Sequence, residues 1–283
     1  MRIEQLTVQG CNAWNEDALI VNDRLRIYGV LDGATSLAEP DGGATGGYLA
    51  SQAAKLAFES LGPASDMPTL TLRDAVLEAN ARIRARMAEA GVDVNDKQSL
   101  WAAACAVVRI GEHQIEYAQV GDCMILAVYE DGSVRTVTYD QVEYFDEKSR
   151  LLWEQFRREG FSPQEVRERV YRLIASNRLK TNTPDGYAIL NGDPALEQYV
   201  EHGAFNRIRL KSVIIFTDGL FLPRKAGEPA PPMREIARLI EEKGLAGYAD
   251  WLIAGENEEV ERLGKHARLK ASDDKTALRI RFD

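Results

Sequence analysis

The chain has 283 residues, of which 45% are hydrophobic and 28% charged, and its formal net charge is −9. These proportions are typical of a folded soluble protein and exclude a disordered or fibrous one, and the length supports a sizeable core without requiring two domains. The negative charge disfavours a broad nucleic-acid surface, which relies on basic side chains, and no segment is apolar for long enough to cross a membrane.

The first ninety residues predict a small sheet followed by two helices. Alternating apolar residues and short β-rich runs indicate strands, whereas apolar residues at helical spacing indicate helices. In chain order, strands are expected at 2–10, 18–21 and 25–31, and helices at 44–61 and 71–90. Gly91 is the expected stop signal of the second helix.

The middle of the chain predicts four more strands, at 102–110, 114–120, 124–130 and 134–139. Because the links between them are short and rich in glycine and aspartate, we expect antiparallel neighbours. The range 141–206 is charged, with candidate helices at 143–159 and 163–179. Its apolar residues are few, so it is expected to be a helical insertion or flap.

The last part of the chain returns to the pattern of the sheet. A strand is expected at 212–217, helices at 233–243 and 245–264, and a final strand at 275–282. The order of elements predicts an α+β fold, in which helices cover both faces of a mostly antiparallel, two-layer β-sandwich.

The three cysteines and the N-terminus bear on location. Cys11, Cys105 and Cys123 fit neither a disulfide framework nor a thiolate zinc site, which favours a reducing compartment. The first ten residues include Arg2 and Glu4 and no apolar run, so we expect no signal peptide. The prediction is a cytoplasmic protein that binds neither nucleic acid nor membrane, and no particular oligomeric state is predicted.

Acidic residues recur at the ends of the expected strands, each beside a glycine or a second acid. They are Asn15-Glu16-Asp17, Asp32-Gly33, Gly121-Asp122, Asp218-Gly219 and Ser272-Asp273-Asp274. A single Asp-Gly is common in turns, because aspartate bonds its own backbone and glycine accepts a positive φ. Together, however, these carboxylates would meet at one end of the sheets and repel one another unless a cation neutralised them. An oxygen-only cluster suits Mg²⁺ or Mn²⁺ better than zinc, so the sequence predicts a hard-metal site.

These segments also resemble, in chain order, the motifs of a known enzyme family. Over residues 3–282, the segments Asn15-Glu16-Asp17-Ala18, Asp32-Gly33, Gly121-Asp122-Cys123, Thr217-Asp218-Gly219-Leu220 and Asp273-Asp274-Lys275-Thr276 resemble those of the metal-dependent protein phosphatases of the PPM (type 2C) family. The resemblance implies one four-layer α-β-β-α sandwich domain over residues 1–283, of the bacterial type. It also implies hydrolysis of phosphoserine and phosphothreonine by water activated at a binuclear Mn²⁺ or Mg²⁺ centre, without a phosphoenzyme.

The resemblance assigns the two main metal sites residue by residue. Asp32 would bridge the two metals, and the carbonyl of Gly33 would bind one of them. Asp218 and Asp273 would complete the other metal. Two such cations would lower the pKa of a shared water and offset the charge that grows on the phosphoryl oxygens.

Three further acids are implied near these metals. Glu16 and Asp17 would lie beside the centre and hold its waters. Asp122, together with Asp218, would hold a third and weaker metal.

Four positions depart from the family pattern. Asn12 stands where an arginine usually grips the phosphate, so it is the candidate phosphate-binding position. Ala34-Thr35-Ser36 replaces the His-Gly-Gly of many eukaryotic members, which is the ground for expecting the bacterial type. Cys123 follows Asp122 and is interpreted as a small core residue, with a redox switch as the alternative. Asp274 stands at a common asparagine position, where it would bind a water or accept backbone hydrogen bonds.

Two alternatives to a protein phosphatase remain open at this point. Asn12 is compatible with a phosphatase of a small phosphorylated metabolite, because a bidentate arginine is missing. The chain could also be a catalytically weak relative that binds phosphoproteins for regulation. The arginines of 141–206 form either a solvated helical face or a surface that recognises a phosphorylated partner.

Overall fold

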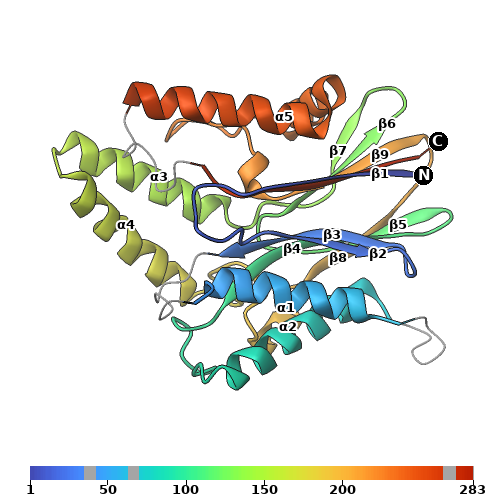
Figure 1. The fold of residues 1–283 in the computed structure, drawn as a ribbon, viewed down its shortest axis with the longest axis horizontal. Helices are drawn as coiled ribbons and strands as arrows, with labels where there is room; N and C mark the ends of the chain where they lie inside the picture. The colour runs from blue at the N-terminus through green and yellow to red at the C-terminus, as the bar shows by residue number, and fades with distance from the viewer. Residues whose placement is uncertain (35–42, 63–69, 264–271, 283) are drawn as a thin grey trace.

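Two five-stranded antiparallel sheets pack face to face in the computed structural model, which describes residues 1–34, 43–62, 70–263 and 272–282 (Figure 1). Their strand orders are β1-β10-β9-β6-β7 and β2-β3-β4-β5-β8. The strands are β1 (Arg2–Val8), β2 (Ala18–Asn22), β3 (Ile27–Ala34), β4 (Ala102–Ile110), β5 (Gln114–Val120), β6 (Met124–Tyr129), β7 (Val134–Thr136), β8 (Glu201–Asn206), β9 (Leu210–Phe216) and β10 (Lys275–Arg281). The helices are α1 (Gly46–Ser60), α2 (Leu72–Glu89), α3 (Glu143–Arg158), α4 (Pro163–Arg178) and α5 (Met233–Leu263), with 3-10 turns η1 (Pro194–Gln198) and η2 (Asp218–Leu220). The predicted α+β class is confirmed, whereas Thr35 and Ser36 lie outside the described residues.

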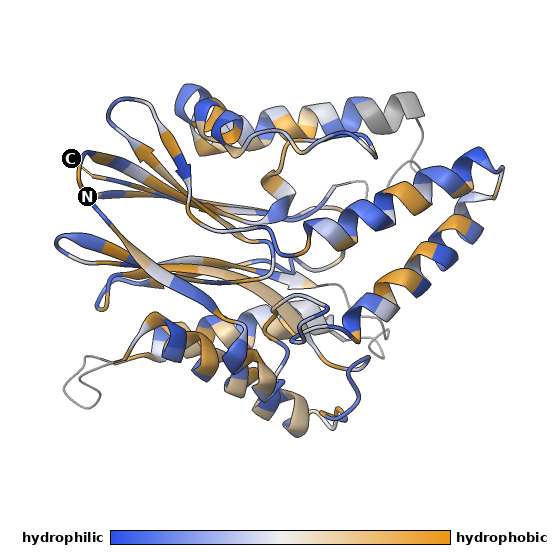
Figure 2. Cartoon of the chain, turned by 180° about the vertical axis from the view of Figure 1, so that it is seen from behind, coloured by the Kyte–Doolittle hydropathy of each residue, from blue (hydrophilic) through white to orange (hydrophobic). Residues whose placement is uncertain are grey.

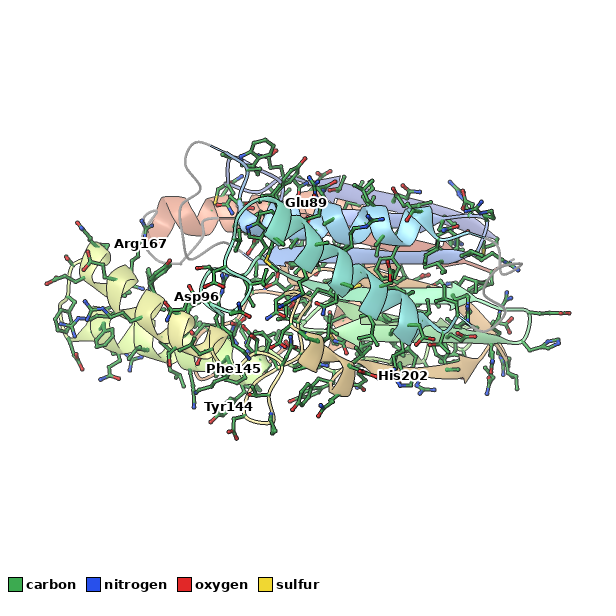
Figure 3. The ribbon with its side chains drawn as sticks, turned by 90° about the horizontal axis from the view of Figure 1, so that it is seen from below. Glu89, Asp96, Tyr144, Phe145, Arg167 and His202 are labelled. Carbon is green, nitrogen blue, oxygen red and sulfur yellow. The ribbon has the colours of Figure 1, made fainter. Side chains whose placement is uncertain are left out.

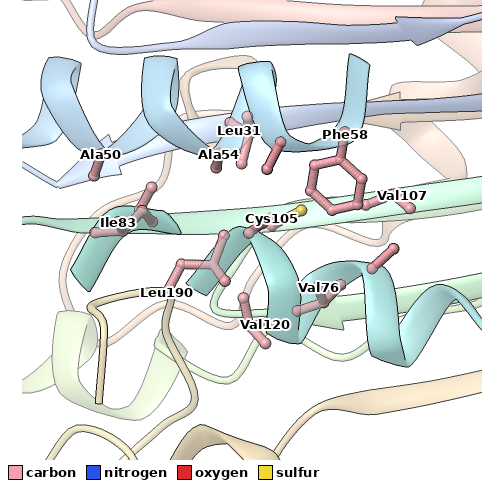
Figure 4. Packing of buried hydrophobic residues seen from close by; sticks show 14 of the residues in the cluster. Leu31, Ala50, Ala54, Phe58, Val76, Ile83, Cys105, Val107, Val120 and Leu190 are labelled. Carbon is pink, nitrogen blue, oxygen red and sulfur yellow. The ribbon is translucent and has the colours of Figure 1, made fainter. Parts of the chain in front are cut away.

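Apolar side chains hold the layers together in three stacked clusters. Helices α1 and α2 cover the outer face of the second sheet, where Phe58 of α1 lies beside Val107 of β4 (Figure 4). Val30, Ile125 and Ile215 belong to the cluster between the sheets, and α5 packs on the outer face of the first sheet. The predicted α-β-β-α order of layers is therefore confirmed.

The helix boundaries follow local sequence signals. Thr71 and Asp74 form a reciprocal capping box at the start of α2, which satisfies backbone N–H groups that a helix start leaves open. Gly91 follows the end of α2 with a φ of 75°. Gly244 has a φ of 74° inside α5 and separates its two helical segments, as the sequence predicts.

Hydropathy is distributed as this layering requires. Figure 2 shows apolar residues along the strands and polar ones on the outward faces of the helices. Among the helices of the described residues, none combines the length and the apolar character that a bilayer crossing requires.

The link between β5 and β6 differs from the prediction. The short spacing predicts antiparallel neighbours, but β5 pairs with β4 and β8 while β6 pairs with β7 and β9. Gly121, with a φ of 79°, lets the chain pass directly from one sheet to the other. Short links require only that strand ends be close, so sequence spacing cannot separate a hairpin from this crossing. The crossing leaves Asp122 at the end of the space between the sheets.

The range 141–206 contains the two predicted helices, which form a hairpin. Figure 3 shows this hairpin extending away from the sheets, with Tyr144 and Phe145 near its base and Arg167 on α4. A small cluster that includes Trp153 and Val170 holds α3 and α4 together. The last residues of the range are not helical, because they form β8 and pair with β5. The sequence pattern does not predict this strand, since of its six residues only Phe205 is buried.

Candidate metal centre

The acidic segments meet because antiparallel pairing brings strand starts and strand ends together. In the second sheet, Ala18 pairs with Leu31, which places Asp17 next to Asp32. In the first sheet β9 pairs with β10, so Asp218, just after β9, lies near Asp273, just before β10. The crossing at Asp122 joins the same end of both sheets.

Three of these carboxyl groups strongly disfavour ionisation. Burial raises the pKa of Asp32 well above its ordinary value, and the charges of Asp17, Asp218, Asp122 and Asp273 raise it further. Burial also raises the pKa of Asp17, although a hydrogen bond from Thr217 opposes the shift. The pKa of Asp122 rises for the same first reason, and among the neighbouring charges that of Asp218 contributes most. These shifts indicate a tight cluster of like charges.

At two positions beside the acids only glycine fits, because another main-chain segment lies where a Cβ would be. A Cβ at Gly219 would lie 1.9 Å from the carbonyl oxygen of Asp274, and one at Gly33 would lie 2.5 Å from the carbonyl oxygen of Glu16. Neither glycine has a positive φ. A positive φ is therefore not the reason for glycine at these two positions, although Asp218-Gly219 lies in the turn η2. Here glycine lets main-chain segments that carry acids touch.

Asp274 fastens the loop before β2 to the start of β10. Its two carboxylate oxygens accept hydrogen bonds from the backbone N–H groups of Gly10 and Glu16, both at 2.7 Å. This geometry agrees with the structural interpretation of Asp274. A carboxylate offers an acceptor on both sides, which an asparagine amide does not.

Thr217 connects the two sheets at the centre of the cluster. Its hydroxyl donates to Asp17 at 2.8 Å and accepts from the backbone N–H of Thr276 at 3.1 Å. Because Thr217 is fully buried, these bonds fix the Asp17 carboxylate relative to β9 and β10.

Asn12 and Glu16 lie together at the edge of the cluster. The Asn12 amide donates to the Glu16 carboxylate at 3.2 Å, and Gly33 N–H donates to the Glu16 carbonyl at 3.1 Å. Glu16 is 1% exposed. The structure thus brings the predicted phosphate-binding position next to the predicted acids.

Cys123 lies against the acidic cluster and also belongs to the apolar core. Ligand atoms of Asp32, Asp122 and Cys123 all lie within 4.8 Å of one another. Burial raises the pKa of the Cys123 thiol well above its ordinary value, so the thiol stays protonated at neutral pH. Cys123 also packs in the apolar cluster between the sheets, which agrees with its interpretation as a core residue.

Two acids at the base of the α3–α4 hairpin were missed by sequence reasoning. Burial is the main cause that raises the pKa of Asp140 to about 6 and that of Asp146 to about 7, and the charge of Asp218 contributes to both. Both residues lie in a stretch where charged residues are frequent, so the sequence carries no distinctive signal for them.

A cavity of about 770 Å³ opens beside the acids. Its lining includes Asp122, Asp218 and Asp273 together with residues of α3. The segment 221–233, which includes Phe221 and Leu222, also lines the cavity. Gly227 N–H donates to Glu147 of α3 at 2.7 Å, which ties this segment to α3.

The donor set fits a hard divalent cation. Apart from the Cys123 thiol, the side-chain donors of the cluster are carboxylate oxygens, the preferred ligands of Mg²⁺ and Mn²⁺. Among the described residues, no lysine or arginine forms an ion pair with Asp17, Asp32 or Asp122, and their raised pKa values come from burial and mutual repulsion. Bound cations would relieve both effects.

The fold and this carboxylate cluster are those of a metal-dependent hydrolase. The chain matches the family model of protein phosphatase 2C over residues 10–254, and it therefore belongs to the protein phosphatase 2C family. This confirms the resemblance found in the sequence. A search of curated proteins found no match.

Solved bacterial phosphatases share the fold. Stp1, a serine/threonine phosphatase from Staphylococcus aureus, is 17% identical with a TM-score of 0.55, over 99% of this chain and 94% of that one. The serine/threonine phosphatase PstP/Ppp from Mycobacterium tuberculosis is 18% identical with a TM-score of 0.54, over 100% and 98%. The catalytic domain of PstP in complex with two manganese ions is 17% identical with a TM-score of 0.57, over 98% and 96%.

Proposed function

We propose that this chain hydrolyses phosphoserine and phosphothreonine in proteins with the aid of bound Mn²⁺ or Mg²⁺. The observation that carries the proposal is the meeting of acidic segments from both sheets at one end of the sandwich, in a chain of the protein phosphatase 2C family. One related structure holds two manganese ions, which supports the same metal here.

The proposed ligands follow the expected assignment. Asp32 and the carbonyl of Gly33 would contribute from β3, Asp218 from η2 just after β9, and Asp273 from the segment just before β10. Asp122 would contribute to a third site. When bound, two cations supply a water of lowered pKa and offset charge on the phosphoryl oxygens.

The protein's own side chains fix the geometry around these ligands. The hydrogen bond from Thr217 orients Asp17, and Asp274 holds the backbone at Glu16. Positions that are fixed before substrate arrives cost no reorganisation during the reaction.

A protein substrate is supported by the cavity beside the acids. A phosphomonoester group alone would fill only a small part of its volume of about 770 Å³, and residues of α3 and of the segment 221–233 line it as well as the acids. Residues that flank the phosphorylated side chain would occupy the remainder. We therefore favour a phosphorylated protein over a small phosphoester.

The proposed location is the cytoplasm. All three cysteines lie in the described residues and are free, and Cys11 is exposed. Free thiols are typical of a reducing compartment. The net charge of −9 supports a partner other than nucleic acid.

The test is hydrolysis of p-nitrophenyl phosphate with and without Mn²⁺. We expect Mn²⁺-stimulated activity that EDTA abolishes, and a loss of at least about a hundredfold in kcat/KM for Asp218→Asn, since even outer-shell changes cost ten- to a hundredfold. The control is Asp131→Asn, which changes an exposed aspartate in a turn. Metal-independent turnover that Asp218→Asn leaves unchanged would refute the mechanism.

Comparing phosphopeptides with a panel of small phosphoesters then tests the substrate class.

A further inference from the structure

A lysine with no exposed surface lies next to the acidic cluster. Lys275 begins β10, two residues after Asp273, and its side chain is 0% exposed. Its ammonium group donates to both carboxylate oxygens of Glu256 on α5, at 3.1 and 3.0 Å. Burial of an ammonium group is costly unless a counter-charge and hydrogen bonds compensate it, so this arrangement requires an explanation.

The ammonium group of Lys275, whose three N–H donors are shared among four acceptors, also contacts the segment that carries the acid. The ammonium donates to the Ser272 hydroxyl and to the main-chain carbonyl of Asp273, both at 3.0 Å. Ser272 in turn donates to Glu256 at 2.7 Å. The Lys275–Glu256 ion pair therefore joins α5 to the sheet and also holds the backbone at Asp273, through the hydrogen bond from Lys275 to the Asp273 carbonyl.

A second set of bonds holds the same segment from the other side. The carboxylate of Asp273 accepts from the N–H of Asp274 at 3.0 Å, and the Asp274 carboxylate holds Gly10 and Glu16. Asp273 is thus fixed between the loop before β2 and the buried pair.

Glu256 also removes an electrostatic conflict. An uncompensated ammonium beside a cation site would repel the cation, because Coulomb interactions are strong where water is excluded. The bidentate contact with Glu256 neutralises Lys275, so that its donors can position the backbone at little electrostatic cost to metal binding.

We propose that the buried Lys275–Glu256 ion pair positions Asp273 and thereby sets the affinity of its divalent metal site. The inference rests on the proposed function, in which Asp273 is a metal ligand. Lys275 is accordingly a positioning residue that acts through Asp273.

The test measures Mn²⁺ binding by isothermal titration calorimetry on the full chain. The double variant Lys275→Met/Glu256→Gln removes one positive and one negative charge, so the local net charge is unchanged while the grip on Asp273 is lost. We expect its dissociation constant for Mn²⁺ to rise on the order of tenfold or more, the usual effect of changing groups that orient a metal ligand.

A second ion pair on the same helix provides the matched control. Lys211 of β9 and Glu241 of α5 are in contact at 2.6 Å, and Glu241 also pairs with Arg279 of β10. Lys211 lies at the end of β9 opposite to Asp218, about 20 Å away along the strand. The variant Lys211→Met/Glu241→Gln should lose thermal stability in EDTA but keep its Mn²⁺ affinity within about twofold, because it does not touch the ligand segment.

Two further variants keep the outcomes distinct. Glu256→Asp shortens the carboxylate without removing its charge, and it tests the proposal if the double variant does not fold; we expect a smaller rise, about threefold. A folded double variant or Glu256→Asp with the wild-type dissociation constant would overturn the proposal.

Asp273→Ala is titrated in parallel. If Asp273→Ala also binds Mn²⁺ normally, the ligand assignment of the proposed function fails. If only Asp273→Ala binds Mn²⁺ more weakly, the ligand assignment stands and only the role of Lys275 is refuted.

Discussion

Replacing Asp122 by asparagine should stabilise the metal-free protein although it removes a proposed metal ligand. Carboxylate oxygens of Asp122 and Asp32 lie within 4.8 Å of each other. With an effective dielectric constant of about 20, two unit charges at that distance repel by about 3.5 kcal/mol. Protonation relieves part of this repulsion, so we expect a gain of about 2 kcal/mol in the free energy of unfolding, or about 5 °C in Tm.

The gain should depend on pH with a defined sign. Because the pKa of Asp122 is raised in the folded state, the folded protein binds more protons than the unfolded chain at pH values above the ordinary pKa of aspartate. Wild-type stability then falls as pH rises through the folded pKa. The Tm difference between Asp122→Asn and wild type should therefore be near zero at pH 4 and largest under alkaline conditions.

The assay is thermal unfolding in EDTA and in excess Mn²⁺ across this pH range. Ligand at a hundred times its dissociation constant stabilises a folded protein by about 2.7 kcal/mol, so Mn²⁺ should favour the wild type and shrink or reverse the difference. Asp131→Asn is the control, since hydrogen bonds from Ser133 lower the pKa of Asp131 and its neutralisation should give no gain. The reasoning fails if Asp122→Asn lowers Tm in EDTA at pH 8, or if its effect is independent of pH.

Two further substitutions test neighbouring parts of the centre. Asp274→Asn turns one of the two side-chain oxygens that accept from the backbone N–H groups of Gly10 and Glu16 into a donor. The free energy of unfolding, measured by chemical denaturation, should fall by about 2 kcal/mol. Unchanged stability would show that these two hydrogen bonds are dispensable. Asn12→Arg should lower KM for p-nitrophenyl phosphate by roughly tenfold, because a charge-assisted hydrogen bond contributes about 1.5–3 kcal/mol. An unchanged KM, with Asn12→Gln as the control for side-chain length, would show that phosphate is held elsewhere.

The layers of the fold could be predicted because each depends on a local pattern. The period of apolar residues separates strands from helices, and Gly91 and Gly244 break helices where the sequence indicates. Strand pairing across the Gly121-Asp122 link could not be predicted in the same way. The hydrogen bonds that decide it come from strands far away in the chain, and β8 was missed because it has a single buried side chain.

The acidic residues were predictable as a set, whereas their supports were not. Asp122 and Asp218 stand just beyond strand ends as the sequence indicates, whereas Asp32 lies inside β3, two residues before its end. The bonds that hold such acids in place join residues hundreds of positions apart, as between Thr217 and Asp17. No motif marks a buried lysine such as Lys275, because its importance comes from the α5 carboxylate that it meets.

At this end of the sandwich the buried lysine is neutralised whereas the buried aspartates are not, and this difference connects stability with function. The one fully buried lysine beside the acids, within the described residues, is already neutralised by Glu256 and so does not compensate Asp32. The hydrogen bonds in the cluster come mainly from backbone N–H groups and from Thr217, which orient carboxylates without cancelling their charge. Repulsion among Asp17, Asp32 and Asp122 therefore remains in the metal-free fold. Because a cation that binds there relieves this repulsion, the same arrangement that weakens the metal-free protein strengthens its affinity for metal.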